Sequence, residues 1–204
     1  MLSDRLHQKT LAYYEEHGTE FLNSTVSADM SGLYESFLAH VPPRGSILDA
    51  GSGSGRDSAA FLKMGYSVVS IDAAPRMVEA TTKLTGQAAL LMRFDEFEFD
   101  NEFDGVWACA SLLHVPRVEL PLIHSRLARA LRPYGVLFAS FRYGDSERMR
   151  GDRFFNDMNE DLLRRYLYAG AELQPFQTWT TEDTRPERRG ELWINTIAKK
   201  GGRQ

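Results

Sequence analysis

The chain has 204 residues, of which 43% are hydrophobic and 25% are charged, and its net charge is −4. This composition is typical of a single globular domain of ordinary size, large enough to bury a core. The acidic balance argues against a general nucleic-acid binder, which carries a basic excess. Cys109 is the single cysteine. An internal disulfide is therefore excluded, and a reducing compartment is favoured.

The opening stretch, MLSDRLHQKTLAYYEEH, is too polar for a secretory signal peptide. No apolar run approaches the roughly 20 residues that span a bilayer. We therefore expect a cytoplasmic protein without membrane contact.

The charge is unevenly distributed along the chain. Residues 1–125 carry 9 Lys and Arg against 17 Asp and Glu, whereas residues 126–204 carry 15 against 11. The arginine-rich C-terminal part suits an anionic substrate, but a mixed, solvated surface is the simpler explanation.

The first 42 residues are expected to form a helical lid segment. Their apolar positions recur at helical spacing, at Leu11, Tyr14, Phe21, Met30, Leu33, Tyr34, Phe37 and Leu38. A polar connection at residues 23–25 separates two helices, and the prolines of VPPRG at residues 41–45 end the second. We expect a cofactor-binding core over residues 43–200 of the same single domain, with a mobile, substrate-side insertion at about 143–159.

Strands and helices alternate from residue 47 onwards. Short apolar runs predict strands at residues 47–48, 66–71, 88–92, 103–110 and 136–141. Stretches bounded by Gly or Pro predict helices at residues 56–64, 75–85, 117–132 and 159–168.

The end of the chain follows a different pattern. Residues 173–180 and 192–198 read as two strands, and the polar loop between them is too short for a crossover helix. Parallel neighbours need such a crossover, so this pair is predicted to be antiparallel. The fold class is therefore α/β, a mostly parallel sheet with helices on both faces and a C-terminal antiparallel hairpin.

A glycine-rich turn, ILDAGSGSGRDS at residues 47–58, joins the first predicted strand to a helix. Glycines let a ligand approach the backbone, and a helix start offers free N–H groups. The two candidate ligands are a nicotinamide dinucleotide and S-adenosylmethionine. Arg56 stands where a dinucleotide fingerprint has its third glycine, which packs helix against strand.

Two acidic residues bear on the same choice. Asp49 would repel a pyrophosphate and would suit the cationic amino acid part of S-adenosylmethionine. Asp72, at the end of the second strand, can bind ribose hydroxyls in either reading, so it does not discriminate.

Four motifs, in order and at the right spacing, resemble those of class I S-adenosylmethionine-dependent methyltransferases. LDAGSGSG is similar to their first motif, SIDAAPRM to their second, FDGVWACASLLHV to their fourth strand and its turn, and ALRPYGVLFASF to their fifth-strand motif. The resemblance covers roughly residues 10–200. It implies a Rossmann-like, seven-stranded sheet in an enzyme of the bacterial small-molecule type, with S-adenosylmethionine as cofactor and S-adenosylhomocysteine as product.

The resemblance also assigns a cofactor site. Gly51 to Gly53 would pass under the methionine part, Asp72 would bind the ribose, Ala73 and Met77 would flank the adenine, and Ala110 would approach by its backbone. The place of the usual adenine-binding acid falls on Met92, a departure from the family pattern. The expected cofactor-binding residues are Tyr13, Tyr14, Asp49, Gly51, Ser52, Gly53, Arg56, Asp72, Ala73, Met77, Met92, Arg93, Phe94 and Ala110.

Methyl transfer from a sulfonium depends mainly on positioning, and a base is needed only for a protonated nucleophile. His114, just beyond the fourth strand, is the candidate base, with a histidine that only orders its turn as the alternative. Cys109 reads as a packing residue. The remaining histidines have no metal-ligand spacing, so no metal is expected.

The substrate is expected above the cofactor, near Tyr143, Arg148, Trp179 and Arg185. Arginine can fix a carboxylate or phosphate, and tryptophan can stack on a flat ring; ordinary loop contacts are the alternative. The predicted function is methyl transfer to a small molecule, because the chain is acidic and has no appended nucleic-acid module. The alternatives are an RNA- or protein-modifying methyltransferase, a cofactor-binding protein without catalysis, and a dinucleotide oxidoreductase.

Overall fold

A computed structural model of the chain describes residues 2–170, 172–185 and 188–202. Its main sheet has seven strands in the order β3-β2-β1-β4-β5-β9-β8. The first five strands of this order are parallel, and β9 is antiparallel to both β5 and β8. The strands of this sheet are β1 (Ser46–Ala50), β2 (Ser67–Asp72), β3 (Leu90–Leu91), β4 (Phe103–Ala108), β5 (Leu131–Arg142), β8 (Leu173–Glu182) and β9 (Leu192–Lys200). The predicted fold class is confirmed.

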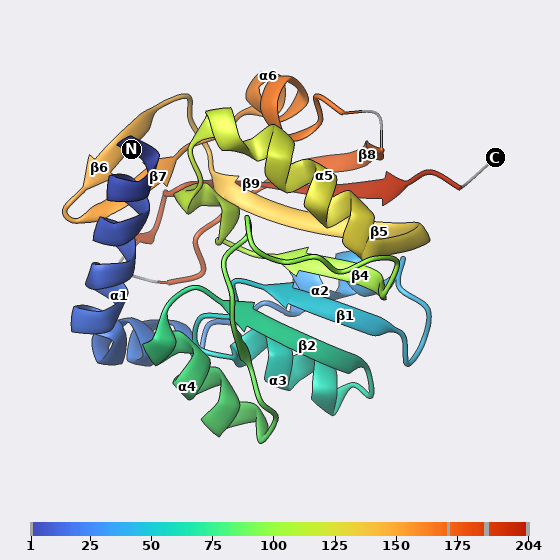
Figure 1. Ribbon diagram of the computed structural model, residues 1–204, viewed down its shortest axis with the longest axis horizontal. Coiled ribbons are helices and arrows are strands. Elements are labelled where there is room, and N and C mark those ends of the chain that lie inside the picture. Colours follow the sequence, from blue (N-terminus) through green and yellow to red (C-terminus); the bar gives the residue numbers. More distant parts are fainter. Residues whose placement is uncertain (1, 171, 186–187, 203–204) are drawn as a thin grey trace.

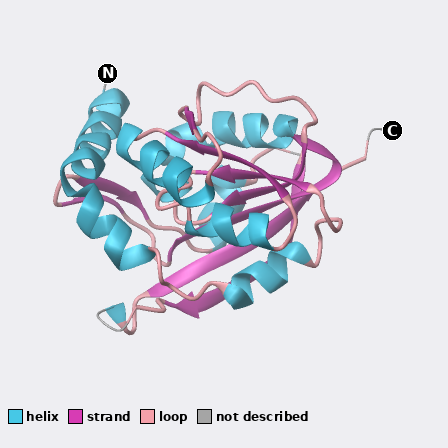
Figure 2. Ribbon diagram, turned by 90° about the horizontal axis from the view of Figure 1, so that it is seen from below, coloured by secondary structure: helices cyan, strands magenta, loops and turns pink. Residues whose placement is uncertain are grey.

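Helices cover both faces of this sheet (Figures 1 and 2). They are α1 (Leu2–Thr25), α2 (Ser31–Leu38), α3 (Arg56–Lys63), α4 (Pro75–Thr85), α5 (Leu120–Ala130) and α6 (Glu160–Leu162), with the short helices η1 (Leu112–His114), η2 (Arg117–Glu119) and η3 (Leu163–Leu167). Pro75 begins α4 and Gly86 ends it in a left-handed conformation, as the sequence indicated.

Alternation along the central strands divides the core into two layers. Ile47, Trp107 and Phe138 pack with the residues of α2 and α3 in one buried cluster. Their strand neighbours Leu48 and Val106 pack with the residues of α5 in the other. Apolar residues facing both ways are what a parallel sheet with two covered faces requires.

Several predicted elements differ from the observed ones. The strand expected at 88–92 is only the edge pair Leu90–Leu91. The helix expected at 117–132 is divided into η2 and α5 and ends at Ala130, because the next residues already pair in β5. The helix expected at 159–168 is the short α6 followed by a π-helical turn, η3.

The insertion after β5 is a structured hairpin. Strands β6 (Glu147–Arg150) and β7 (Arg153–Asn156) pair antiparallel around Gly151, which has φ 61°. The Gly-Asp pair between two short runs is a hairpin signal that the sequence analysis did not use. Phe154 and Phe155 anchor this hairpin in the protein interior.

Helix α1 lies beside this hairpin at one end of the sheet (Figure 1). The Thr10 hydroxyl accepts a hydrogen bond from the Phe154 N–H, at 3.1 Å. At the other side, Arg76 of α4 donates to the Glu15 carbonyl at 3.0 Å. The first helix therefore bridges two regions far apart in the sequence, and a lid role for residues 1–42 stays a prediction. Across the described residues, no helix combines the length and apolarity needed to cross a bilayer.

Candidate active site

A cavity of about 780 Å³ opens at the carboxyl ends of the parallel strands, beneath α1. This is the edge where ligands bind in open α/β sheets. Most of the predicted site residues line it together: Tyr13, Tyr14, Gly51, Ser52, Gly53, Arg56, Asp72, Ala73, Met77, Met92, Arg93, Phe94, Ala110, His114, Trp179 and Arg185. Asp49, Tyr143 and Arg148 are not in this lining.

The glycine turn forms one wall of the cavity with its backbone. Gly51 has φ 91°, and a Cβ at this position would lie closer than 3.0 Å to the Cβ of Ser111. Gly55 has φ 77°, and its Cβ would lie 2.8 Å from the Cα of Thr81 on α4. Gly55 thus provides the close packing that a dinucleotide-binding fold obtains from a glycine at the place of residue 56. Residue 56 can therefore be an arginine.

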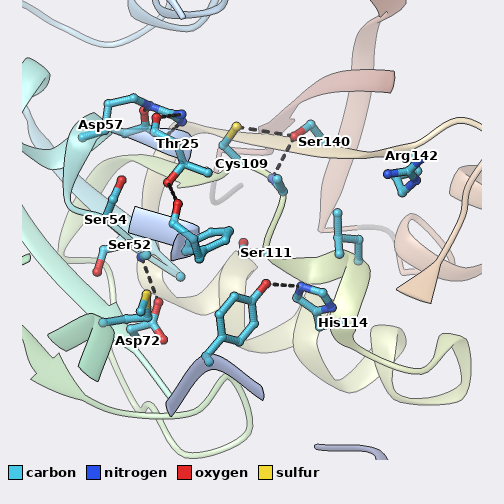
Figure 3. Close-up of a pocket in the computed structure, with 18 of the residues that line it drawn as sticks. Thr25, Ser52, Ser54, Asp57, Asp72, Cys109, Ser111, His114, Ser140 and Arg142 are labelled. Atoms are coloured by element: carbon cyan, nitrogen blue, oxygen red, sulfur yellow. Dashed lines mark hydrogen bonds and ion pairs between the residues drawn. The ribbon is translucent and has the colours of Figure 1, made fainter. Parts of the chain in front are cut away.

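Asp72 ends β2 and organises this turn (Figure 3). One carboxylate oxygen accepts from the Gly53 N–H and the other from the Ala74 N–H, each at 2.9 Å. Burial raises the pKa of Asp72 against the opposing effect of these N–H groups. Each oxygen keeps a free lone pair, so the carboxylate can still accept hydrogen bonds from a ligand.

Asp49 lies behind the cavity wall, contrary to the expected ligand contact. Its carboxylate is 2% exposed and accepts from the Ser58 hydroxyl, which also lies 2.7 Å from the Ser70 hydroxyl. Burial, with the nearby Asp57 charge, raises the pKa of Asp49 to about 8. Burial thus favours the neutral acid at this position, behind the wall of the cavity.

Asp57 is the ionised acid of this region. It accepts from Tyr34 at 2.5 Å, from the Trp107 indole at 2.9 Å and from two nitrogens of Arg56. Burial alone would raise its pKa, but the Arg56 guanidinium and these hydrogen bonds hold the pKa of Asp57 below its ordinary value. Arg56 also donates to the Thr25 carbonyl at 3.1 Å, which fixes the end of α1 against the turn.

His114 connects the lid to the fourth strand. Its Nδ1 lies 2.6 Å from the Phe154 carbonyl, which can only accept, so Nδ1 carries the proton. Its Nε2 therefore accepts from the Tyr14 hydroxyl at 2.8 Å. Burial lowers the pKa of His114 to about 4, and burial raises the pKa of Tyr14 to about 12. Both groups are neutral at pH 7.

The expected adenine wall follows β3. Met92 donates its N–H to the Asp72 carbonyl at 2.9 Å, which places Phe94 at the cavity. The Arg93 guanidinium pairs with Asp95 at 2.9 Å and reaches His7 on α1. Asp95, weighed as a substitute acid, also lines the cavity.

The four predicted substrate residues divide evenly. Trp179 and Arg185 line the cavity, and Arg185 is paired with Asp183 at 2.6 Å. Tyr143 is exposed and bonds to Glu160, while Arg148 pairs with the buried Asp157. Tyr143 is outside the lining because it continues the chain directly after Arg142, the last residue of β5, and successive extended residues face opposite ways.

Sequence reasoning missed several lining residues. Asn195, Thr181 and Ser140 come from β9, β8 and β5, and Arg153 from β7. The Arg153 guanidinium lies over the Tyr13 ring, 4.3 Å from its centroid. No local motif marks these positions, because their neighbours come from strands far apart in sequence. In the part of the chain that the structure describes, no group of His, Cys, Asp or Glu side chains is arranged for a metal ion.

Comparisons with known proteins agree with this fold. The chain resembles a Burkholderia thailandensis 1,6-didemethyltoxoflavin-N1-methyltransferase, solved with 1,6-didemethyltoxoflavin and S-adenosylhomocysteine, at a TM-score of 0.78 and 22% identity over 98% of this chain and 89% of that one. It also resembles the [4+2]-cyclase SpnF, at a TM-score of 0.72 and 15% identity over 94% of this chain and 95% of that one. At these identities the likeness shows the fold.

Sequence comparisons add the family. Residues 47–135 match the model of a methyltransferase domain family. A Bacillus subtilis protein named "Putative methyltransferase YqeM" is 30% identical over 135 residues, covering 61% of this chain. The chain spans about half (53%) of that relative's length. With the fold and the motifs, these matches support the resemblance to class I S-adenosylmethionine-dependent methyltransferases.

Proposed function

We propose that the protein transfers a methyl group from S-adenosylmethionine to a small-molecule acceptor. The observation that carries this proposal is the glycine turn, whose bare backbone at Gly51 and Gly53 forms one wall of a 780 Å³ cavity. Small-molecule sites have volumes of roughly 300–1,000 Å³, so the cavity suits a cofactor together with a small acceptor.

The residues present fit the cofactor. Gly51 to Gly53 would hold the methionine part, Asp72 would accept hydrogen bonds from the ribose hydroxyls, and Ala73, Met77, Met92 and Phe94 would enclose the adenine. Tyr13 and Tyr14 on α1 offer aromatic faces that suit a nearby sulfonium. The exposed Ala110, at φ 51°, would present its backbone to the cofactor.

When bound, the cofactor supplies an electrophilic methyl group on a cationic sulfur. An acceptor's lone pair would form the new bond to this carbon, and sulfur would keep the electrons of the bond that is broken. The protein's contribution is to align the reactants and exclude water, which is worth several powers of ten in rate. Positioning by the cavity walls therefore suffices for an acceptor that reaches the site with a free lone pair.

His114 remains the proposed base for an acceptor that carries a proton. Its Nε2 has to be released by the Tyr14 hydroxyl first, and a pKa of about 4 makes it a weak base. The geometry favours an additional role, in which the neutral imidazole anchors α1 across the cavity through Tyr14.

A small acceptor is favoured over RNA or protein because residues of α1 and β7 line the cavity, and these two elements lie side by side (Figure 1). The Burkholderia neighbour was solved with a small acceptor and S-adenosylhomocysteine. Salt-dependent retention on an RNA column would favour the RNA alternative. The likeness to a cyclase is a reason to test the alternative of a cofactor-binding protein that transfers no methyl group, because one fold can support several chemistries.

The first test is thermal unfolding with S-adenosylmethionine, S-adenosylhomocysteine or NADH at about 1 mM. A ligand at about 100 times its Kd adds roughly 2.7 kcal/mol of stability, which is several degrees for a domain of this size. We expect a shift with both sulfur ligands and none with NADH. Asp72→Ala should abolish the shift, and Asp100→Ala, on the exposed surface, should keep it. A shift with NADH alone would overturn the proposal.

Turnover separates an enzyme from a binding protein. Formation of S-adenosylhomocysteine from S-adenosylmethionine is measured with small-molecule fractions of a cell extract, and with RNA or protein fractions as alternatives. Turnover with the small-molecule fraction supports the proposal. Cofactor binding without turnover in any fraction would favour the binding protein.

A further inference from the structure

Six cavity-lining residues lie on one face of the antiparallel end of the sheet. Residues directly opposite each other in a ladder share a face, and alternate residues of a strand do too. Ser140 pairs with Asn195, which pairs with Trp179, and Arg142 pairs with Trp193, which pairs with Thr181. We refer to these six residues as the acceptor platform: Ser140, Arg142, Trp179, Thr181, Trp193 and Asn195.

Arg142 gives the platform an unused donor. The residue is 9% exposed, and its Nη2 pairs with Glu191 at 2.7 Å. Its Nη1 is buried and has no hydrogen-bond partner among the described residues. Figure 3 places Arg142 on the opposite side of the pocket from Asp72, and therefore away from the expected ribose position. A buried N–H without a partner costs free energy. A ligand that offers a hydrogen-bond acceptor here therefore binds more tightly.

Asn195 gives the platform an unused acceptor. The residue is 1% exposed, and its Nδ2 donates to the Thr181 hydroxyl at 3.0 Å. Its Oδ1 is buried and, within the described part of the chain, accepts no hydrogen bond. The Ser140 hydroxyl is already engaged, since it accepts from the Ala110 N–H at 2.9 Å and contacts the Cys109 sulfur.

The two free groups are close enough to bind one ligand edge. Arg142 and Asn195 are diagonal neighbours across the β5–β9 ladder, and such pairs lie roughly 7–8 Å apart at their Cα atoms. A ligand that satisfies both must offer a hydrogen-bond acceptor to Arg142 and a donor to Asn195. Adjacent C=O and N–H groups are what a lactam or an imide presents.

We propose that the methyl acceptor is a planar heterocycle with a C(=O)–NH edge, bound by Arg142 Nη1 and Asn195 Oδ1. This inference rests on the proposed function and names its substrate class. Trp193 lies directly opposite Arg142 and Trp179 directly opposite Asn195, and both offer flat apolar surface to a ring. The Trp193 indole N–H donates to Asp183 at 3.1 Å, which fixes that ring in place.

Charge argues against a carboxylate as the preferred group. Arg142 is already neutralised by Glu191, and its guanidinium also lies 5.9 Å from the Phe155 ring centroid. The free carbonyl oxygen of Asn195 would face a carboxylate oxygen, lone pair against lone pair. A neutral donor–acceptor edge satisfies both groups without leaving a charge unpaired.

Three planar probes of similar size test the proposal by calorimetric titration, with and without saturating S-adenosylhomocysteine. Lumazine presents C(=O)–NH edges, 1,3-dimethyllumazine keeps the ring and carbonyls but has lost both N–H groups, and 2-naphthoate presents a carboxylate. We expect lumazine to bind about tenfold or more tightly than either control, because each control leaves Asn195 unpaired. The S-adenosylhomocysteine titration reports the proposed function separately.

Matched variants locate the probe. Arg142→Lys keeps the charge against Glu191 but not the planar second donor, and Asn195→Leu removes the acceptor. Each should weaken lumazine about tenfold and leave S-adenosylhomocysteine affinity unchanged. Arg150→Gln is the control, since Arg150 contacts the same Glu191 at 3.5 Å from outside the cavity lining.

The ligand series on the unmodified protein decides the matter even where a variant fails to fold. Equal binding of lumazine and its dimethyl form, tighter binding of 2-naphthoate, or no binding of lumazine at about 1 mM would overturn the inference. Failure of S-adenosylhomocysteine to bind, with lumazine still discriminated, would instead overturn the proposed function and leave a heterocycle-binding site.

Discussion

The two ends of the cavity are built in different ways. The proposed cofactor end is made largely of backbone from one continuous segment, the turn after β1, where Asp72 accepts from the Gly53 N–H. The acceptor end is made of side chains from three strands, and Arg142 and Asn195 are brought together by the β5–β9 ladder. A site made of local backbone leaves a mark in the sequence, whereas one made of distant side chains does not.

The first prediction concerns Gly51, at the proposed cofactor end, and has the largest expected effect. Gly51→Ala places a Cβ against Ser111 at φ 91°, so it combines a steric clash with left-handed strain. We expect a loss of about 2–5 kcal/mol in unfolding free energy and loss of S-adenosylhomocysteine binding. Chemical denaturation and calorimetry measure the two effects.

Gly65 supplies a matched control. It has φ 90°, almost the same as Gly51, but nothing lies within 4 Å of a Cβ built there. Gly65→Ala should therefore cost only the strain of about 1–2 kcal/mol and leave ligand binding intact. If both variants behave alike, close packing of the turn is not what the cofactor end depends on.

The second prediction concerns pH and Asp49, behind the same turn. A carboxyl whose folded pKa is raised to about 8 stabilises the fold fully below its unfolded pKa of about 4. That contribution is lost progressively as pH rises from about 4 through 8, because the unfolded chain has then released a proton that the folded state still holds. Asp49→Asn, which mimics the neutral acid, should remove a slope of up to about 1 kcal/mol per pH unit.

Denaturant unfolding of the wild type and of Asp49→Asn between pH 5 and pH 8 gives the difference in their unfolding free energies. The two proteins share all other titrating groups, so the pH dependence of this difference reports on Asp49. We expect the variant to gain stability relative to the wild type as pH rises. A constant difference across the range would show that Asp49 is ionised throughout. The charge expected from the sequence would then be present behind the turn.

The contrast between local backbone and distant side chains also explains which parts of the site the sequence predicted. Gly51, Asp72 and Met92 belong to motifs with a fixed order, so their place at the cavity followed from the resemblance. The burial of Asp49 beside Ser58 and Ser70, which favours its neutral form, is a tertiary property that the local motif does not show. The hairpin of β6 and β7 was read as a mobile cover, since its polar composition hides the two aromatic anchors.

The third prediction concerns helix α1 and its contact with His114. Tyr14→Phe removes the hydrogen bond to His114 Nε2 and leaves a buried nitrogen unpaired, at a cost of about 1–3 kcal/mol. Tyr13→Phe is the control, because its ring rather than its hydroxyl contacts Arg153. Thermal unfolding measures both. Equal stability of the two variants would show that His114 does not anchor α1, and a free Nε2 would strengthen its proposed role as a base.

The smallest effect is expected at Tyr143, one residue from the platform. It is 42% exposed and faces away from the cavity, with its hydroxyl 3.3 Å from Glu160. Tyr143→Phe should change stability by less than about 0.5 kcal/mol and leave lumazine affinity unchanged, whereas Arg142→Lys weakens it. The two variants differ by one position along β5, which is the step that exchanges one sheet face for the other. A tenfold loss at Tyr143 would mean that the acceptor end extends beyond the cavity, and the platform would no longer define it.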